Sequence, residues 1–191
     1  GTRKDLRQAT VNTAIAGRPY QMAAIQRVAE VFVTDGEKSM QGAKRNALLV
    51  MATGSGKTRT AAALTEILFK NNWAKRVLFL ADRNALVRQA KNNFNDYLPE
   101  LSSINLSEEK ENDTTRLVFS TYPSMLNKID SAHTDDERFY GVGHFDLIIL
   151  DEAHRSIYNR YKSIFEYFDA LIVGLTATPK DSIDHNTFEL F

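Results

Sequence analysis

The chain has 191 residues, a length that suits one α/β domain, and its 43% of hydrophobic residues can form an ordinary packed core. Lys and Arg (24) balance Asp and Glu (24), so the net charge neither favours nor excludes a nucleic-acid partner. The absence of cysteine excludes disulfides and cysteine-ligated zinc, and the four histidines lack metal-ligand spacing.

No apolar run approaches the roughly 20 residues that span a bilayer. With no signal-peptide pattern either, we expect a cytoplasmic protein without a membrane partner. Because the chain starts at Gly1, we expect a fragment.

Apolar strands and helical patterns alternate along the chain. A loose polar lead-in over 2–16 precedes a helix that starts at Pro19 and turns Met22, Ile25, Ala29 and Phe32 inward. Exposed loops are predicted over 35–45, 105–114 and 131–137. Further helices are predicted over 58–70, 86–97, 124–129 and 156–168. Strands are predicted over 47–51, 76–81, 117–120, 145–150 and 171–175. This alternation predicts a three-layer α/β domain with a mostly parallel central sheet, whose ligands bind at the carboxyl ends of the strands.

A glycine-rich segment between the first strand and the next helix has the features of a phosphate loop. Its residues are Thr53, Gly54, Ser55, Gly56, Lys57 and Thr58, although Met51 stands where the general pattern begins with glycine. Glycines let backbone N–H groups surround a phosphate, and the helix directs its positive end at the same anion. Lys57 is then expected to reach the β- and γ-phosphates of ATP, and the Thr58 hydroxyl to ligate Mg²⁺. The alternative is a glycine-rich turn with a chance Lys-Thr pair.

An acidic pair follows the strand over 145–150. Asp151 would hold Mg²⁺ through water, and Glu152 would act as the general base that polarises the attacking water. A hydrolase needs both functions. The alternative is an ordinary acidic turn after a strand, which the phosphate loop upstream disfavours. The sequence therefore predicts an ATP hydrolase with catalytic residues Lys57, Asp151 and Glu152.

The run Asp-Glu-Ala-His over 151–154 resembles the first RecA-like domain of superfamily 2 helicases and translocases. Further segments match in order: 18–21 an adenine-reading element, 79–86 and 120–124 two elements that contact the nucleic-acid backbone, and 174–179 a coupling motif. The resemblance implies a RecA-like P-loop NTPase domain over 18–180, after a lead-in over 1–17. Residues 181–191 would then start the linker to a second RecA-like domain.

The segments 73–83, 151–161, 165–170 and 173–181 resemble more narrowly the motor (R) subunit of type I restriction enzymes. That family translocates double-stranded DNA with ATP before cleavage, and works with modification and specificity subunits. Its nuclease domain precedes the motor, but only Asp5 offers a carboxylate upstream of Arg18. Its arginine finger comes from the second RecA-like domain, so this fragment alone is expected to bind ATP weakly and to hydrolyse it hardly at all.

The resemblance also implies roles for residues outside the phosphate loop and the acidic pair. Gln21, helped by Arg18, would read adenine, with a solvated helix residue as the alternative. His154 would report the nucleotide state to Thr176 or Thr178, or else be a structural histidine. DNA phosphates would be contacted by Arg83, Ser120 and Thr121. The alternatives are a local ion pair for Arg83 and strand-end capping for Ser120 and Thr121.

Three hypotheses follow for the function. The first is an ATP-driven DNA translocase domain of a type I restriction subunit. The second keeps the fold but acts as a DEAH-type helicase in repair or on RNA, which the segment after Asp151 disfavours. The third is a nucleotide-dependent switch without a motor stroke, which Glu152 disfavours because a pure binder needs no water-activating base.

Overall fold

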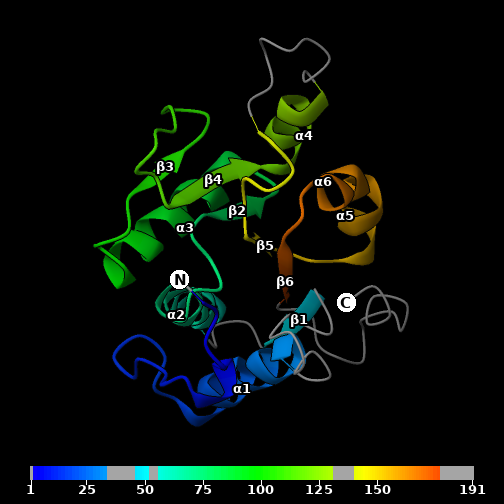
Figure 1. The fold of residues 1–191 in the computed structure, drawn as a ribbon. Helices are drawn as coiled ribbons and strands as arrows, with labels where there is room; N and C mark the ends of the chain where they lie inside the picture. Colours follow the sequence, from blue (N-terminus) through cyan, green and yellow to red (C-terminus); the bar gives the residue numbers. More distant parts are fainter. Residues whose placement is uncertain (1, 34–45, 52–55, 131–139, 177–191) are drawn as a thin grey trace.

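Residues 2–33, 46–51, 56–130 and 140–176 are described in a computed structural model of the protein (Figure 1). The loops predicted over 35–45 and 131–137 lie outside these residues. The same holds for Thr53, Gly54, Ser55 and Thr178.

A six-stranded parallel sheet forms the centre of the described fold, in the order β1-β6-β5-β2-β4-β3. Its strands are β1 (Asn46–Val50), β2 (Val77–Ala81), β3 (Ser103–Asn105), β4 (Leu117–Thr121), β5 (Leu147–Leu150) and β6 (Leu171–Thr176). Every residue of β2, β4, β5 and β6 is buried, as expected when helices cover both faces of a sheet. The predicted α/β architecture is confirmed, and the described sheet is parallel throughout.

Helices cover the two faces of this sheet (Figure 1). One core lies under α1 (Pro19–Val33), α2 (Lys57–Lys70) and α3 (Asn84–Tyr97), and includes the mutually contacting rings of Phe79, Phe94 and Phe119. The other core lies under α4 (Tyr122–Asp130), α5 (Arg155–Arg160) and α6 (Lys162–Tyr167). The domain therefore has three layers. Because helices cover both faces of the sheet, side chains that bind a ligand are expected at the carboxyl ends of its strands.

The lead-in is packed, contrary to the expectation of a loose segment. Leu6, in the short 3-10 helix η1 (Leu6–Gln8), is 2% exposed, and Ile15 and Ala16 are also buried in the first core. The indole of Trp73 donates a hydrogen bond to the carbonyl of Lys4 at 2.7 Å. Apolar residues too widely spaced to form a periodic pattern thus anchor the segment through tertiary contacts.

Three local expectations in the rest of the chain were wrong. Met22 is 37% exposed, although Ile25, Ala29 and Phe32 face the core as predicted. A three-residue strand, β3, starts just before the predicted loop over 105–114 and pairs with β4. The helix predicted over 156–168 is two helices, because Tyr161 leaves helical geometry and turns its ring into the core.

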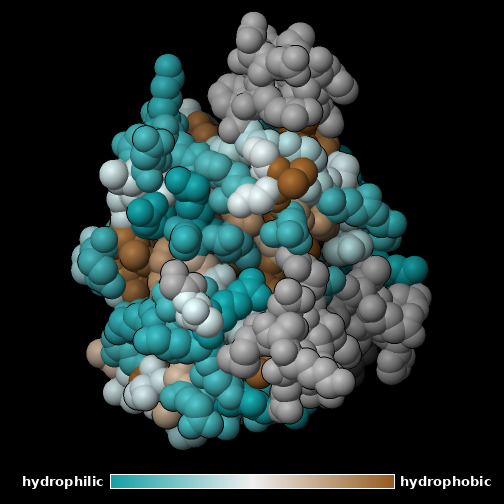
Figure 2. Space-filling model, in the orientation of Figure 1, coloured by the Kyte–Doolittle hydropathy of each residue, from teal (hydrophilic) through white to brown (hydrophobic). Residues whose placement is uncertain are grey.

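The described surface is mostly hydrophilic in the view of Figure 2. Its large hydrophobic side chains with substantial exposure are Tyr20, Met22 and Val142. In the described ranges, no helix has both the length and the apolar character to cross a bilayer.

Candidate active site

Three adjacent strands deliver the candidate site residues to one edge of the sheet. β6 pairs with β1 on one side and with β5 on the other, so their carboxyl ends lie together. Beyond the strands, the N–H of Met51 donates to the carbonyl of Thr176 at 3.0 Å. The N–H of Ala153 donates to the carbonyl of Leu175 at 2.8 Å. These bonds hold the start of the phosphate loop and the acidic segment on either side of β6.

Lys57 lies between the two predicted catalytic carboxylates. Its Nζ is 2.9 Å from Oδ1 of Asp151 and 2.9 Å from Oε1 of Glu152. These partners are more than ninety residues away in sequence, so only the fold brings them together. The side chains are 23% exposed for Lys57, 13% for Asp151 and 39% for Glu152, which leaves the cluster half-shielded from water. One cation thus compensates two carboxylates at the edge where a phosphate would bind.

The charges of this cluster move two pKa values in opposite directions. Burial opposes the charged form of Lys57, but the hydrogen bond with Glu152 and the ion pair with Asp151 outweigh it and raise its pKa above the ordinary 10.5. Burial likewise opposes ionisation of Glu152, but Lys57, helped by His154, holds its pKa below the ordinary 4.5. Both shifts favour the charged forms of Lys57 and Glu152 at neutral pH.

These shifts predict a pH dependence of stability for the metal-free, nucleotide-free chain. Because the folded-state pKa of Glu152 lies below 4.5, its contribution is present above that value and is lost as pH falls through the folded pKa. The partly exposed side chain limits this contribution to less than about 1 kcal/mol. Urea unfolding between about pH 7 and about pH 3 should therefore show a slightly steeper loss for wild type than for Glu152→Gln. Parallel profiles would mean that the ion pair does not stabilise the fold.

Gly56 and Gln21 bring the upstream helix against the phosphate loop. Gly56 has φ of 81°, a left-handed conformation that favours glycine, and it precedes α2 directly. A Cβ at this position would lie 2.6 Å from Nε2 of Gln21. Gln21 is 4% exposed, and its Oε1 accepts a hydrogen bond from the N–H of Arg18 at 3.3 Å. The alternative of a solvated Gln21 is therefore wrong, while adenine reading by Gln21 and Arg18 stays a prediction.

Glu152 has a strained backbone that the sequence did not reveal. Its φ is 53°, and a non-glycine residue in the left-handed region costs about 1–3 kcal/mol. The N–H of His154 donates to the Glu152 carbonyl at 2.8 Å, and Nε2 of His154 lies 3.2 Å from Oε2 of Glu152. The turn thereby directs the two carboxylate oxygens of Glu152 to different partners, Lys57 and His154.

Tyr122 contacts the acidic segment from a separate element, and sequence reasoning missed it. Its hydroxyl donates to the main-chain carbonyl of Asp151 at 2.8 Å, and its ring is fully buried. The ring stacks on Tyr161, with centroids 4.9 Å apart and planes 12° apart. The available signal was a tyrosine directly after a buried strand, at the edge where the site residues meet.

The residues predicted to contact DNA lie at the ends of β2 and β4. Arg83 is exposed and precedes α3 as its N-cap. Ser120 is 2% exposed, and its hydroxyl donates to the carbonyl of Thr121. The predicted phosphate contact would need this hydroxyl at the surface, and the structure buries it instead. The Thr121 hydroxyl donates to Ser124 Oγ at 2.9 Å and accepts the Ser124 N–H at 3.3 Å, so at the end of β4 it caps the start of α4. DNA contact by Arg83 and Thr121 stays a prediction.

The remaining predicted site residues differ in their setting. Thr58, at the start of α2, is partly buried beside Lys57. Thr176, at the end of β6, is 1% exposed, so any coupling through it would act inside the fold. The coupling roles of His154 and Thr176 stay predictions.

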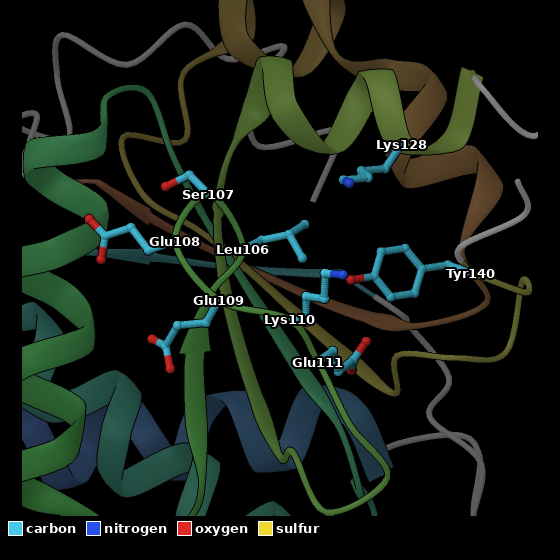
Figure 3. Close-up of a pocket in the computed structure, with 8 residues that line it drawn as sticks. All are labelled: Leu106, Ser107, Glu108, Glu109, Lys110, Glu111, Lys128 and Tyr140. Carbon is cyan, nitrogen blue, oxygen red and sulfur yellow. The ribbon is translucent and has the colours of Figure 1, made fainter.

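A separate cavity of about 620 Å³ lies beyond β3 and β4 (Figure 3). It is lined by residues 106–111 together with Lys128 of α4 and Tyr140. Glu108 and Glu109 point from it toward α3, where they pair with Arg88 and Lys91. No residue predicted for the ATP site lines this cavity, so it lies apart from the predicted nucleotide site.

The fold and the site define a class of protein. A parallel sheet in this order, covered by helices on both faces and with a lysine at the start of α2 facing two carboxylates after β5, has the RecA-like α/β fold. A family model described as "Type III restriction enzyme, res subunit" matches residues 14–181, and the chain belongs to this family. The class implies nucleotide binding.

Curated relatives are endonuclease subunits of type I restriction enzymes. The EcoAI subunit of Escherichia coli is 36% identical over 180 residues, which cover 91% of this chain and 21% of that protein. The EcoKI subunit of Escherichia coli K12 is 31% identical over 188 residues, covering 85% and 15%. The chain is homologous to the helicase-like region of these subunits and spans about a fifth of their length or less.

Solved structures agree with this assignment. The fragment structure of a protein assigned as an HsdR subunit of a type I restriction enzyme from Vibrio vulnificus YJ016 has a TM-score of 0.62 and 26% identity, covering 98% of this chain and 30% of that one. The Sulfolobus solfataricus SWI2/SNF2 ATPase core has a TM-score of 0.64, covering 95% and 35%. Its 17% identity supports the fold alone.

Proposed function

We propose that this chain is the ATP-binding motor domain of a type I restriction endonuclease R subunit, and that it drives ATP-dependent translocation on double-stranded DNA before cleavage. The observation that carries the proposal is the ion-paired cluster in which Lys57 lies 2.9 Å from both Asp151 and Glu152. A phosphate-binding lysine and a carboxylate pair at one sheet edge are the parts that ATP hydrolysis requires.

The chain's own residues divide the work of hydrolysis. Bound ATP would draw Lys57 from the carboxylates to the β- and γ-phosphates, and the backbone around Gly56, with the N-terminal end of α2, would hold the phosphate oxygens. Glu152, whose pKa lies below the ordinary value while paired, would be released as a carboxylate able to accept the proton of the attacking water. Gln21, whose Nε2 lies beside Gly56 of the loop, would read the adenine of ATP.

The donor set at this edge fits Mg²⁺. Oδ1 of Asp151 is buried and, although it is paired with Lys57, receives no hydrogen bond of good geometry from the described residues. Thr58, which carries a hydroxyl, is the second residue of α2, directly after Lys57. Hard oxygen ligands of this kind, completed by phosphate and water, suit magnesium. When bound, the ion would neutralise charge on the phosphate oxygens.

The partners of the whole protein are part of the proposal. DNA as a partner is supported by a structural relative at 27% identity, LlaGI, a Type ISP restriction-modification enzyme solved in complex with a DNA substrate mimic, and we propose that the DNA is double-stranded. By analogy with the type I relatives, we propose that modification and specificity subunits assemble around the full-length subunit. A second RecA-like domain in the full-length chain would supply the arginine finger.

The test compares the 191-residue chain with the full-length subunit. The chain alone is expected to bind ATP-Mg²⁺ and to turn it over slowly, because an absent arginine finger costs about 10³–10⁵ in rate. The full-length subunit, in its complex, is expected to hydrolyse ATP and to be stimulated by duplex DNA. Stimulation by RNA alone would instead support a DEAH-type helicase. Brisk turnover by the isolated chain would contradict the need for a second domain.

A further inference from the structure

We propose that Tyr122 is a positioning residue for ATP hydrolysis, because its hydroxyl fixes the peptide that joins Asp151 to Glu152. This inference rests on the proposed ATPase function and extends it to a residue outside the phosphate loop and the acidic segment. In this role, the Tyr122 hydroxyl bonds the main chain and not the carboxylate of Asp151 or Glu152. It acts through the backbone on which both carboxylates stand.

The hydrogen bond is placed where it controls the geometry of Glu152. The carbonyl of Asp151, which accepts the Tyr122 hydroxyl at 2.8 Å, lies in the same rigid peptide plane as the N–H of Glu152. A rotation of this plane changes φ of Glu152, which is held at 53° in the sparsely populated left-handed region. A bond that fixes the plane therefore opposes relaxation of Glu152 toward ordinary backbone angles.

Bonds on the other sides of the turn complete this restraint. The N–H of Asp151 donates to the carbonyl of Leu80, and the N–H of Ala153 donates to the carbonyl of Leu175. These two contacts tie the turn to its neighbouring strands. The Asp151 carbonyl between them is held by a side chain, so a single hydroxyl can be removed without changing the backbone.

The ring that carries this hydroxyl is itself fixed. Tyr122 is fully buried, and it stacks on Tyr161, which is 5% exposed. Tyr122 is the first residue of α4, directly after β4, and Tyr161 lies between α5 and α6. The stack therefore joins the start of α4 to the junction between α5 and α6. Its position also explains why the helix predicted over 156–168 breaks at Tyr161.

Tyr122 also connects the acidic pair to the carboxyl end of β4. It follows Thr121 directly, at the end of the strand where a DNA phosphate contact was predicted. A small displacement of the start of α4 would be transmitted by the hydroxyl to the Asp151–Glu152 peptide. Reacting groups misplaced by about 1 Å can lose about a hundredfold in rate, so a displacement of this size would matter.

The decisive comparison removes one hydroxyl from either ring of the stack in the full-length subunit. Tyr122→Phe is expected to lower kcat for ATP by about tenfold or more, with KM for ATP within about twofold of wild type. Tyr161→Phe is the matched control, because the ring stays stacked and its hydroxyl has no hydrogen-bond partner among the described residues. It is expected to keep wild-type kcat.

A donor-restoring replacement separates positioning from general destabilisation. Replacing Tyr122 with 4-aminophenylalanine keeps the ring and an N–H donor, and is expected to recover kcat to within about threefold of wild type. The proposal is overturned if Tyr122→Phe keeps wild-type kcat, if both phenylalanine variants lose kcat equally, or if a folded 4-aminophenylalanine variant stays slow. If Tyr122→Phe does not fold, the 4-aminophenylalanine variant alone decides. A wild-type subunit without ATP turnover would overturn the proposed function, and this inference with it.

Discussion

Glu152→Gln in the full-length subunit is expected to lower ATP turnover by about 10²- to 10⁴-fold, the range that a general base contributes. Glutamine keeps the shape of the side chain and can still contact Lys57 and His154, but it cannot accept the proton of the attacking water. ATP binding should persist, because the substitution removes one of the two ion pairs that Lys57 must break to reach the phosphates. The expected signature is a low kcat with a dissociation constant for ATP equal to or below that of wild type.

Glu108→Gln provides the matched control for this substitution. Glu108 pairs with Arg88 at 2.8 Å, but the two side chains are 48% and 59% exposed, and Glu108 lines the cavity beyond β3. The same chemical change should therefore leave turnover unaltered. Nucleotide affinity measured by calorimetry and single-turnover hydrolysis separate binding from chemistry. A Glu152→Gln variant with near-normal kcat would remove Glu152 from the role of general base.

Residues joined by short spacings were predictable from the sequence. A strand, a glycine-rich turn and a helix over about twenty residues carry their own signals, and these placed Lys57 and Thr58 at the start of α2. The apolar run before Asp151 likewise predicted β5, and strand ends in a parallel sheet meet at one edge. The meeting of Lys57 with Asp151 and Glu152 follows from these two local predictions.

The features that were missed depend on contacts between distant segments. β3 has three residues, too few for an alternation pattern, and it exists because β4 offers an unpaired edge. The helix break at Tyr161 follows from a stack with Tyr122, which is 39 positions earlier in the sequence. The left-handed φ of Glu152 has no glycine to signal it. Each of these features is decided by packing that overrides local preference.

Lys57→Ala is expected to weaken ATP binding to the 191-residue chain more than any other single change proposed. Truncating one partner of a partly buried charge pair costs about 2–5 kcal/mol, which corresponds to roughly 30- to 4,000-fold in the dissociation constant. In the nucleotide-free chain the same change leaves Asp151 and Glu152 facing each other without a cation. The pKa of Glu152 should therefore rise, because Lys57 is the main group that lowers it against burial.

Lys70→Ala is the control for this prediction, because it removes the same side chain from the last turn of the same helix. Lys70 pairs with Glu66 at 3.5 Å and is 68% exposed, so its loss should change ATP affinity little. Equal affinities for wild type, Lys57→Ala and Lys70→Ala in equilibrium binding would contradict a phosphate-binding role for Lys57. A loss confined to Lys57→Ala, with a raised pKa of Glu152 in the nucleotide-free variant, would tie both effects to one ammonium group. The ion-paired cluster would then be the resting form of the ATP site, in which Lys57 exchanges carboxylates for phosphates when ATP binds.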